Sequence, residues 1–180
     1  MSRVVLLTGS PRKSGNSHRM ADSFAGAAAK LGVEVVRFDV AQMNVAGCLA
    51  CEGCVKKGKC VVDDDFAAIA QALEQADGVV FAAPVYWFTF PAQIKAVIDR
   101  LFSFPCAGKS FEGKKSALLG CCEEHTPSTF GGMRFAYERT VEFLKGDNVG
   151  EVLVHGVLNV GDIEKTDGLA RAAALAEKFA

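Results

Sequence analysis

The chain alternates between short, nearly continuous apolar runs and longer segments in which apolar residues recur at helical spacing. Strands of a parallel sheet covered on both faces have the first pattern, and amphipathic helices have the second. The pattern predicts five strands, over residues 4–8, 33–40, 78–83, 114–120 and 151–158. It predicts five helices, over residues 17–31, 64–75, 92–102, 131–144 and 165–179.

Regular alternation of strands and helices predicts the α/β class and a doubly wound, five-stranded parallel sheet with strand order 2-1-3-4-5. The chain has 180 residues, of which 50% are hydrophobic, so we expect residues 1–180 to form a single domain with a sizeable core. In this topology ligands bind beyond the carboxyl ends of the strands, where strands one and three lie side by side.

The charge and cysteine content narrow the class of partner. A formal net charge of −1 argues against nucleic acid, which selects clustered Lys and Arg, and against a strongly acidic electron carrier. No segment is long and apolar enough to span a bilayer, and residues 1–9 predict a strand rather than a signal peptide. We therefore expect a cytoplasmic protein with neither membrane nor nucleic acid as its partner, whose seven cysteines serve metal or redox chemistry rather than structural disulfides.

The connection between the first strand and the first helix, residues 8–17, has the composition of a phosphate site. A helix N-terminus presents unpaired N–H groups and partial positive charge, which suit an anion. Glycines in this segment permit tight turns, an arginine can bind phosphate through paired hydrogen bonds, and short polar side chains supply further donors. The residues that supply these features are Gly9, Ser10, Arg12, Ser14, Gly15, Asn16 and Ser17. The alternative is a polar connection in which Asn16 or Ser17 is an ordinary N-cap.

Two further observations limit the ligand. The segment contains neither G-x-G-x-x-G nor the P-loop G-K-[ST], which argues against a dinucleotide site and against a nucleoside triphosphatase. The connection after the third strand is aromatic and apolar, and its first residues are Pro84, Val85, Tyr86 and Trp87, the only tryptophan. In the predicted topology this connection lies beside the phosphate segment, where it offers walls on which a flat ring can stack. The alternative is that these aromatic residues form a core corner or a dimer surface.

With these features the chain resembles the flavodoxin-like NAD(P)H-dependent FMN reductases, and within them the iron–sulfur flavoprotein branch. The resemblance is carried by four segments and spans residues 3 to about 102: Gly9-Ser10-Pro11-Arg12 with Gly15-Asn16-Ser17, Ala83-Pro84-Val85-Tyr86-Trp87, Ala92-Gln93-Ile94-Lys95-Ala96-Val97-Ile98-Asp99-Arg100, and a cysteine segment ending in Asp63-Asp64-Asp65.

The resemblance implies FMN as cofactor and NAD(P)H as co-substrate, with the phosphate in the first segment and ring contacts from residues 84–87. It also implies a third contact loop after strand four, Gly120-Cys121-Cys122-Glu123-Glu124-His125, and a homodimer or homotetramer. Because FMN itself accepts the hydride, no catalytic side chain is required. His18 and His155 read as structural residues, and His125 as a residue of a solvated loop.

The irregular stretch 41–63 contains Cys48, Cys51, Cys54 and Cys60, spaced C-x2-C-x2-C-x5-C. The first three have ferredoxin-like spacing, and the whole matches the compact motif of the iron–sulfur flavoproteins, which implies a [4Fe–4S] cluster. Free or buried thiols, a zinc site and a thiol–disulfide pair remain open alternatives.

Two functions follow. The first is an NAD(P)H-dependent flavin oxidoreductase that reduces a flavin, a quinone or another small acceptor. The second is an iron–sulfur flavoprotein-type electron-transfer protein that works with ferredoxin-like partners. A partner-binding protein with a vestigial flavin site is a third possibility.

Overall fold

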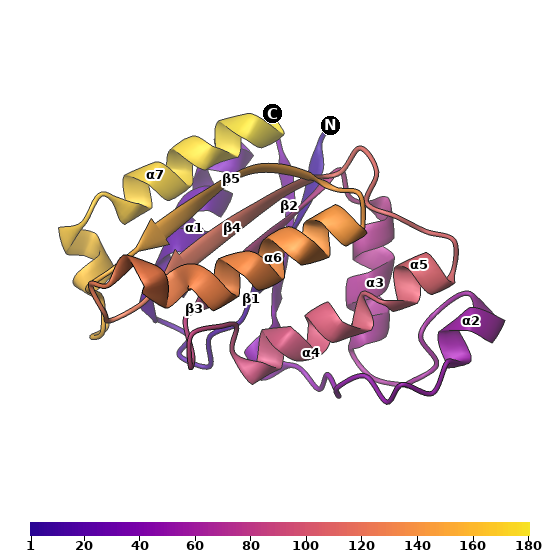
Figure 1. Cartoon of the computed structure of the whole chain (residues 1–180). Helices are drawn as coiled ribbons and strands as arrows, with labels where there is room; N and C mark the ends of the chain where they lie inside the picture. Colours follow the sequence, from indigo (N-terminus) through magenta and orange to yellow (C-terminus); the bar gives the residue numbers. More distant parts are fainter.

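The computed structural model describes all of residues 1–180 and confirms the predicted sheet. Its five strands are parallel and lie in the order β2-β1-β3-β4-β5 (Figure 1). The strands are β1 (Arg3–Thr8), β2 (Glu34–Asp39), β3 (Gly78–Pro84), β4 (Lys115–Cys121) and β5 (Asp147–Val154). Because β1 pairs with both β2 and β3, the chain reverses its winding direction there, which opens a crevice at the carboxyl ends of β1 and β3.

All five predicted helices are present, with ends within a few residues of the expected ones. They are α1 (Asn16–Lys30), α3 (Phe66–Gln75), α4 (Ala92–Arg100), α6 (Gly131–Phe143) and α7 (Gly168–Leu175). The sequence pattern missed two short helices, α2 (Gly53–Lys57) and α5 (Ser103–Cys106), and the 3-10 turns η1 (Val40–Gln42), η2 (Pro127–Phe130), η3 (Asp162–Lys165) and η4 (Ala176–Phe179). None of the helices combines the length and the apolar character that crossing a membrane requires.

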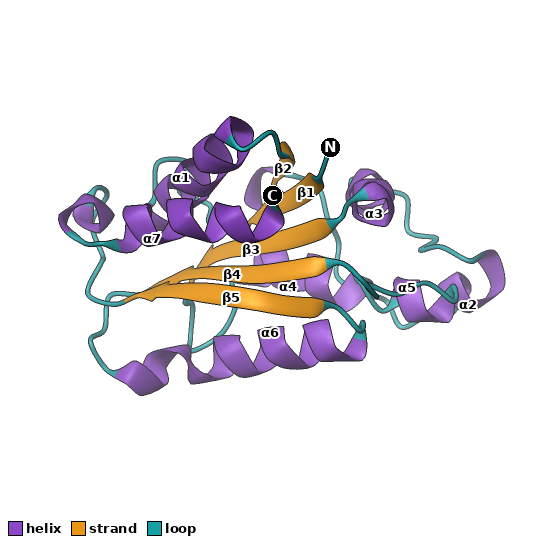
Figure 2. Ribbon diagram, turned by 90° about the horizontal axis from the view of Figure 1, so that it is seen from above, coloured by secondary structure: helices purple, strands orange, loops and turns teal.

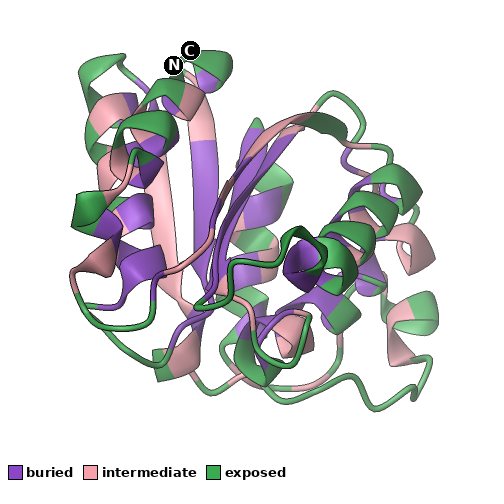
Figure 3. Cartoon of the chain, turned by 60° about the vertical axis from the view of Figure 1, so that its left-hand side comes forward, coloured by how far each residue is buried: buried purple, intermediate pink, exposed green.

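The helices form one layer on each face of the sheet, as Figure 2 shows. Side chains alternate across the sheet, so Val4 and Leu6 of β1 pack with α1 and α7, whereas Val5 and Leu7 pack with α3, α4 and α6. All four side chains are completely buried, and the buried residues follow the central strands (Figure 3). Coverage of both faces explains why the strands read as continuous apolar runs.

The last strand is the one element whose position was predicted wrongly. The sequence pattern placed it over residues 151–158, whereas β5 spans Asp147–Val154. Its first residues are polar and exposed because β5 is an edge strand, and its pairing with β4 shifts register between Ser116 and Ala117. After Val154 the chain leaves the sheet and turns at Gly156, whose φ is +72°. Residues 157 and 158, expected in the strand, belong instead to the wall of a pocket.

Candidate functional site

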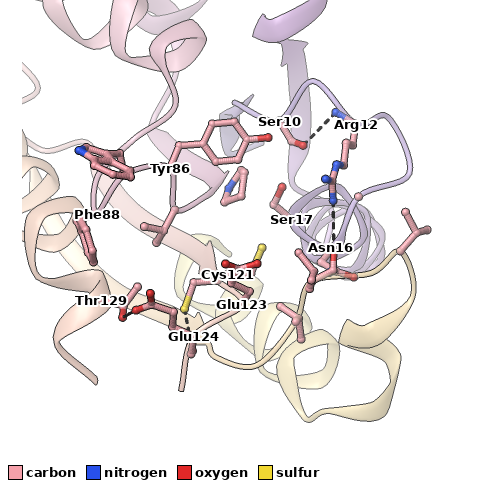
Figure 4. Close-up of a pocket in the computed structure, with 18 residues that line it drawn as sticks. Ser10, Arg12, Asn16, Ser17, Tyr86, Phe88, Cys121, Glu123, Glu124 and Thr129 are labelled. Atoms are coloured by element: carbon pink, nitrogen blue, oxygen red, sulfur yellow. Dashed lines mark hydrogen bonds between the residues drawn. The ribbon is translucent and has the colours of Figure 1, made fainter. Parts of the chain in front are cut away.

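A cavity of about 480 Å³ lies at the carboxyl ends of the strands, where the fold predicts a ligand (Figure 4). Its size is within the usual range for small-molecule sites, roughly 300–1,000 Å³. Ten of the residues expected from the sequence to contact the cofactor line this cavity: Ser10, Arg12, Gly15, Asn16, Ser17, Pro84, Val85, Tyr86, Trp87 and Cys121. The cavity is called the switch-point pocket below.

The phosphate segment presents unsatisfied donors to the switch-point pocket. Helix α1 begins at Asn16, its N-cap is Gly15, and no side chain caps its N-terminus. The first turn of α1 contains no acidic residue. The hydroxyl oxygen Oγ of Ser17 is buried, lines the pocket beside the Cys121 thiol and has no oxygen or nitrogen partner. A buried hydroxyl and an uncapped helix N-terminus are both stabilised by a bound anion.

Two predicted phosphate residues also hold a neighbouring loop in place. The Nη1 atom of Arg12 donates to the carbonyl of Leu158 at 3.3 Å, and the Nδ2 atom of Asn16 donates to the carbonyl of Asn159 at 3.0 Å. The backbone N–H of Ile163 donates to Oδ1 of Asn16 at 3.3 Å. The Asn16 side chain is therefore engaged with residues 159–163, and its contribution to an anion site comes from its backbone N–H in the first turn of α1.

The aromatic connection forms a tight two-residue turn. Tyr86 and Thr89 exchange backbone hydrogen bonds of 2.9 and 3.1 Å, and the two residues between them, Trp87 and Phe88, have φ values of +49° and +66°. This left-handed conformation is unfavourable for bulky side chains and normally selects Gly or Asn. Here it turns the indole of Trp87, which is 91% exposed, outward at the rim of the pocket.

The turn is held in place by close packing of the backbone against α6. A Cβ atom added at Gly132 would lie 2.4 Å from the carbonyl oxygen of Phe88, so only glycine permits this approach. The strained turn and its glycine partner are 44 residues apart in sequence, and the tertiary structure alone brings them together. Strain maintained in this way is typical of functional loops.

The floor of the pocket is provided by the end of β4. Cys121 is almost fully buried, and burial raises the pKa of its thiol to about 12, so it remains a neutral thiol at physiological pH. Burial also raises the pKa of Cys122, whose Sγ contacts the Glu124 carbonyl at 3.3 Å and Nδ1 of His155 at 3.5 Å. The hydroxyl of Thr129 donates to Oε2 of Glu124 at 2.6 Å.

Cys122, Glu123 and Glu124, which belong to the contact loop expected after strand four, also line the pocket. The sequence did not identify the remaining lining residues, which come from the aromatic turn, the turn η2 before α6 and the segment after β5: Phe88, Thr129, Val157, Leu158 and Val160. Val157 and Leu158 were not expected in the pocket, because the sequence pattern assigned them to the last strand.

A second cavity, of about 220 Å³, lies between the cysteine segment and the end of α4. All four predicted metal-ligating cysteines line it: Cys48, Cys51, Cys54 and Cys60. We call it the thiol cavity. All seven cysteines of the chain are free, and nowhere in the chain are three Cys, His, Asp or Glu side chains gathered closely enough to hold a metal ion in this conformation. Cys106 of α5, which the spacing did not identify, is a neighbour of Cys54, and its pKa is raised by burial and by a hydrogen bond to the Cys54 thiol.

One wall of the thiol cavity is a buried arginine, Arg100, whose side chain is 1% exposed. It forms an ion pair of 2.5 Å with Asp64, which is 4% exposed, and its guanidinium lies 4.4 Å from the centre of the Phe66 ring. Its Nη2 atom donates to Sγ of Cys60 at 3.2 Å, and Nη1 donates to the carbonyl of Ala46 at 3.3 Å. Arg100 thus joins both ends of the cysteine segment to α4.

The doubly wound sheet and the pocket at its switch point place the protein in the flavodoxin-like class. The sequence profile of the family described as NADPH-dependent FMN reductase matches residues 2–141. The chain therefore belongs to the NADPH-dependent FMN reductase family. The predicted family, the oxidoreductase class, and FMN and NAD(P)H as the family's cofactor and co-substrate are confirmed at this level.

Curated relatives include iron–sulfur flavoproteins. One from Methanosarcina thermophila is 29% identical over 167 residues, which cover 93% of this chain and 81% of that protein. One from Archaeoglobus fulgidus is 34% identical over 102 residues, which cover 57% of this chain and 46% of that protein. The chain thus spans most of the first relative but about half the length of the second.

Solved structures confirm the fold. An FMN-dependent NADH-azoreductase from Bacillus anthracis, in complex with FMN, superimposes with a TM-score of 0.76 at 13% identity and covers 99% of both chains. An NAD(P)H:quinone oxidoreductase from Methanothermobacter marburgensis superimposes with a TM-score of 0.72 at 17% identity, also over 99% of both chains. At these identities the likeness concerns the fold alone.

Proposed function

We propose that residues 1–180 form one FMN-binding domain and that FMN occupies the switch-point pocket. In this proposal the phosphate lies at the N-terminus of α1 and the ring system lies against residues 84–87 and Cys121. The single observation that carries the proposal is the buried, unpartnered Oγ of Ser17 beside a helix N-terminus that no side chain caps. Both features are stabilised by an anion, and the apolar and aromatic opposite wall suits a flat ring.

The proposed reaction is the transfer of a hydride from NAD(P)H and the reduction of a small acceptor such as a flavin or a quinone. Bound FMN supplies the hydride and electron chemistry, so the protein's part is to bind, to orient and to exclude water. Cys121 contributes a neutral thiol to the floor, because its pKa of about 12 keeps a negative charge away from the ring.

The test is a titration of apoprotein with FMN, followed by anaerobic mixing with NADPH or NADH. We expect quenching of flavin fluorescence on binding and bleaching of the flavin absorbance by at least one nicotinamide. Ser17→Ala removes the orphan hydroxyl, and we expect FMN to bind more weakly by about 1–2 kcal/mol, as for one hydrogen bond to a charged group. Ser23→Ala is the matched control, because it removes a hydroxyl of α1 outside the pocket, which donates to the Leu169 carbonyl of α7 at 2.8 Å. Apoprotein that binds no FMN would refute the proposal.

A second candidate function is electron transfer through an iron–sulfur cluster held by Cys48, Cys51, Cys54 and Cys60. The observation that favours it is that all four thiols line one cavity and that Arg100 donates a hydrogen bond to Cys60. Four thiolates within one short segment are the donor set of a [4Fe–4S] cluster, and a neighbouring guanidinium offsets their negative charge. The segment would have to draw its thiols closer together than they lie in this conformation. When bound, a cluster supplies one-electron transfer, for which a ferredoxin-like protein is the natural partner.

Iron and sulfide assays on anaerobically purified protein test this candidate. We expect about four iron per chain with matching sulfide, and loss of both in Cys60→Ala. Cys122→Ala removes a thiol outside the thiol cavity and should keep the iron. Protein that contains zinc or no metal, in an anaerobic preparation, would exclude the cluster. Stopped-flow reduction by NADPH and by reduced ferredoxin then separates the two functions.

We further propose that the chain assembles as a homodimer or homotetramer, and that the rim of the switch-point pocket takes part in the contact. This proposal is supported by the exposed apolar side chains gathered there: Trp87, Phe88, Leu158 and Val160. Light scattering coupled to size-exclusion chromatography measures the mass directly. A monomer at micromolar concentration would refute the proposal.

A further inference from the structure

His18 occupies a buried position directly behind the phosphate segment. It is the third residue of α1, and its side chain is 1% exposed. Its Nδ1 atom lies 2.7 Å from the carbonyl oxygen of Lys13, and its Nε2 atom lies 2.9 Å from Oγ1 of Thr8. Thr8 in turn donates to Oδ1 of Asp39 at 2.8 Å. The side chain therefore links the phosphate segment to the ends of β1 and β2.

The directions of these hydrogen bonds define the protons on His18. A carbonyl oxygen only accepts, so Nδ1 must carry a proton and donate it to Lys13. The single hydroxyl proton of Thr8 is directed to the carboxylate of Asp39, so the Thr8 oxygen accepts from Nε2, which must carry a proton as well. A histidine that donates from both ring nitrogens is an imidazolium cation.

A cation at His18 also balances the surrounding charges. Asp39 lies 3.8 Å from Nε2 of His18 and accepts a hydrogen bond of 2.6 Å from Nε of Arg37, whose other end is paired with Asp22 of α1. Two carboxylates thus face Arg37 and His18, and a neutral His18 would leave one uncompensated negative charge behind the phosphate segment. Although partial burial acts to raise it, the pKa of Asp39 is held below its usual range by hydrogen bonds from Arg37 and Thr8.

His18 also shapes the segment in front of it. By binding the Lys13 carbonyl, it draws that oxygen inward, and the Arg12 carbonyl is likewise turned inward because it accepts from the N–H of Gly15 at 2.9 Å. Carbonyl oxygens repel phosphate, so turning them away leaves the donors of the first turn of α1 facing the switch-point pocket. The inward position of these carbonyls and the buried positive charge of His18 both favour an anion at the N-terminus of α1.

We propose that the His18 imidazolium is a positioning residue for the phosphate of the cofactor: it holds the carbonyls of the phosphate segment inward and places a buried positive charge behind the anion. The inference rests on the proposed FMN site. It predicts that the protein distinguishes FMN from riboflavin, the same ring system without phosphate, in a manner that depends on the charge of His18. Replacing His18 by a neutral residue removes that charge, so FMN affinity falls, whereas riboflavin affinity does not change.

The experiment compares apoprotein titrations with FMN and riboflavin at pH 7.5, where the phosphate of FMN is already a dianion because its second pKa is about 6. In His18→Gln we expect FMN affinity to be about tenfold lower, the size expected of one charge near a helix terminus. Riboflavin affinity should equal that of the wild type. Lys30→Gln, which removes an exposed positive charge at the opposite end of α1, should behave as the wild type with both ligands.

Each result has one meaning. If neither FMN nor riboflavin binds the wild type, the proposed FMN site fails. If both bind but His18→Gln keeps the wild-type FMN affinity, the role of His18 is refuted. If His18→Gln does not fold, the wild type still decides the matter, because the ring ¹⁵N chemical shifts of His18 report its protons directly. Two protonated nitrogens at pH 7 support the inference, and a neutral ring overturns it.

Discussion

Arg100 and Asp64 form a buried ion pair on which the attachment of the cysteine segment depends. We predict that Arg100→Met destabilises the protein by about 3–5 kcal/mol at pH 7, the usual loss when one partner of a buried pair is removed. The side chains are only 1% and 4% exposed, so water cannot replace the lost partner of Asp64. Methionine has a similar length and keeps the contact with the ring of Phe66, so that the loss reports the charge. A loss of this size would be a large part of the total free energy of unfolding of such a domain, which is roughly 5–15 kcal/mol.

The pKa of Asp64 predicts how the loss of stability in Arg100→Met changes with pH. Although burial acts to raise it, the pKa of Asp64 is lowered below its ordinary value by hydrogen bonds from Arg100 and from the N–H groups of Ala46 and Phe66. In the wild type the stability that this pair contributes is therefore present above the unfolded pKa, about 3.9, and is lost as the pH falls below it. In Arg100→Met the buried, unpaired Asp64 takes up a proton more readily. The difference in stability between the two proteins should therefore narrow as the pH falls from 7 toward 4.

Urea unfolding followed by circular dichroism measures both quantities. Lys95→Met is the matched control, because Lys95 and Asp99 form an ion pair of 2.5 Å whose side chains are 41% and 45% exposed, and such pairs contribute about 0.3–0.5 kcal/mol. A loss below 1 kcal/mol in Arg100→Met, or a difference that does not change with pH, would refute the reasoning. Asp64→Asn combined with Arg100→Met should recover part of the loss, because the buried negative charge is then absent.

Two further predictions concern the switch-point pocket, and a third compares the reactivity of a cysteine at each cavity. Gly9→Ala places a Cβ atom 2.7 Å from Cγ2 of Ile94, so we expect a loss of about 1–3 kcal/mol in urea unfolding together with weaker FMN binding. Trp87→Ala should change the free energy of unfolding by less than about 0.5 kcal/mol, because the side chain is 91% exposed, but should reduce the quenching of bound flavin; unchanged quenching would exclude the indole from the ring site. In metal-free apoprotein at pH 7.5, iodoacetamide should modify the exposed Cys48 within minutes and leave Cys121 unmodified, because burial raises the Cys121 pKa to about 12; mass spectrometry of tryptic peptides reports both.

The sheet and its order could be predicted because the signals are local and repeated. Continuous apolar strands such as β3 can be stable only when both faces are covered, and strand–helix alternation leaves few ways to arrange five of them. The prediction failed at β5, where Asp147 and Asn148 begin an edge strand with polar, exposed residues. An edge strand needs less apolar surface, so the apolar residues of β5 begin later in the chain than its backbone pairing with β4.

The ten expected cofactor residues were found together for the same reason. In a doubly wound sheet the connections after β1, β3 and β4 meet at one edge, so residues that follow these strands become neighbours whatever their separation in sequence. What could not be predicted depends on side-chain direction. Asn16 contacts a loop through its amide, and Trp87 points outward because the turn has positive φ.

The sequence by itself determined the fold class, the strand order, ten of the residues that line the switch-point pocket and the four cysteines of the thiol cavity. These follow from the hydrophobic periodicity, from the glycines and from the position of each residue after a strand. The tertiary structure alone decided the charges behind those sites. His18 read as a structural residue of the first helix, yet Lys13, Thr8 and Asp39 come together around it only after three elements have packed. Arg100 likewise stands in an ordinary helical pattern and meets its carboxylate partner only in the folded chain. Burial and hydrogen-bond direction set the state of such groups, and neither is a property of the linear chain.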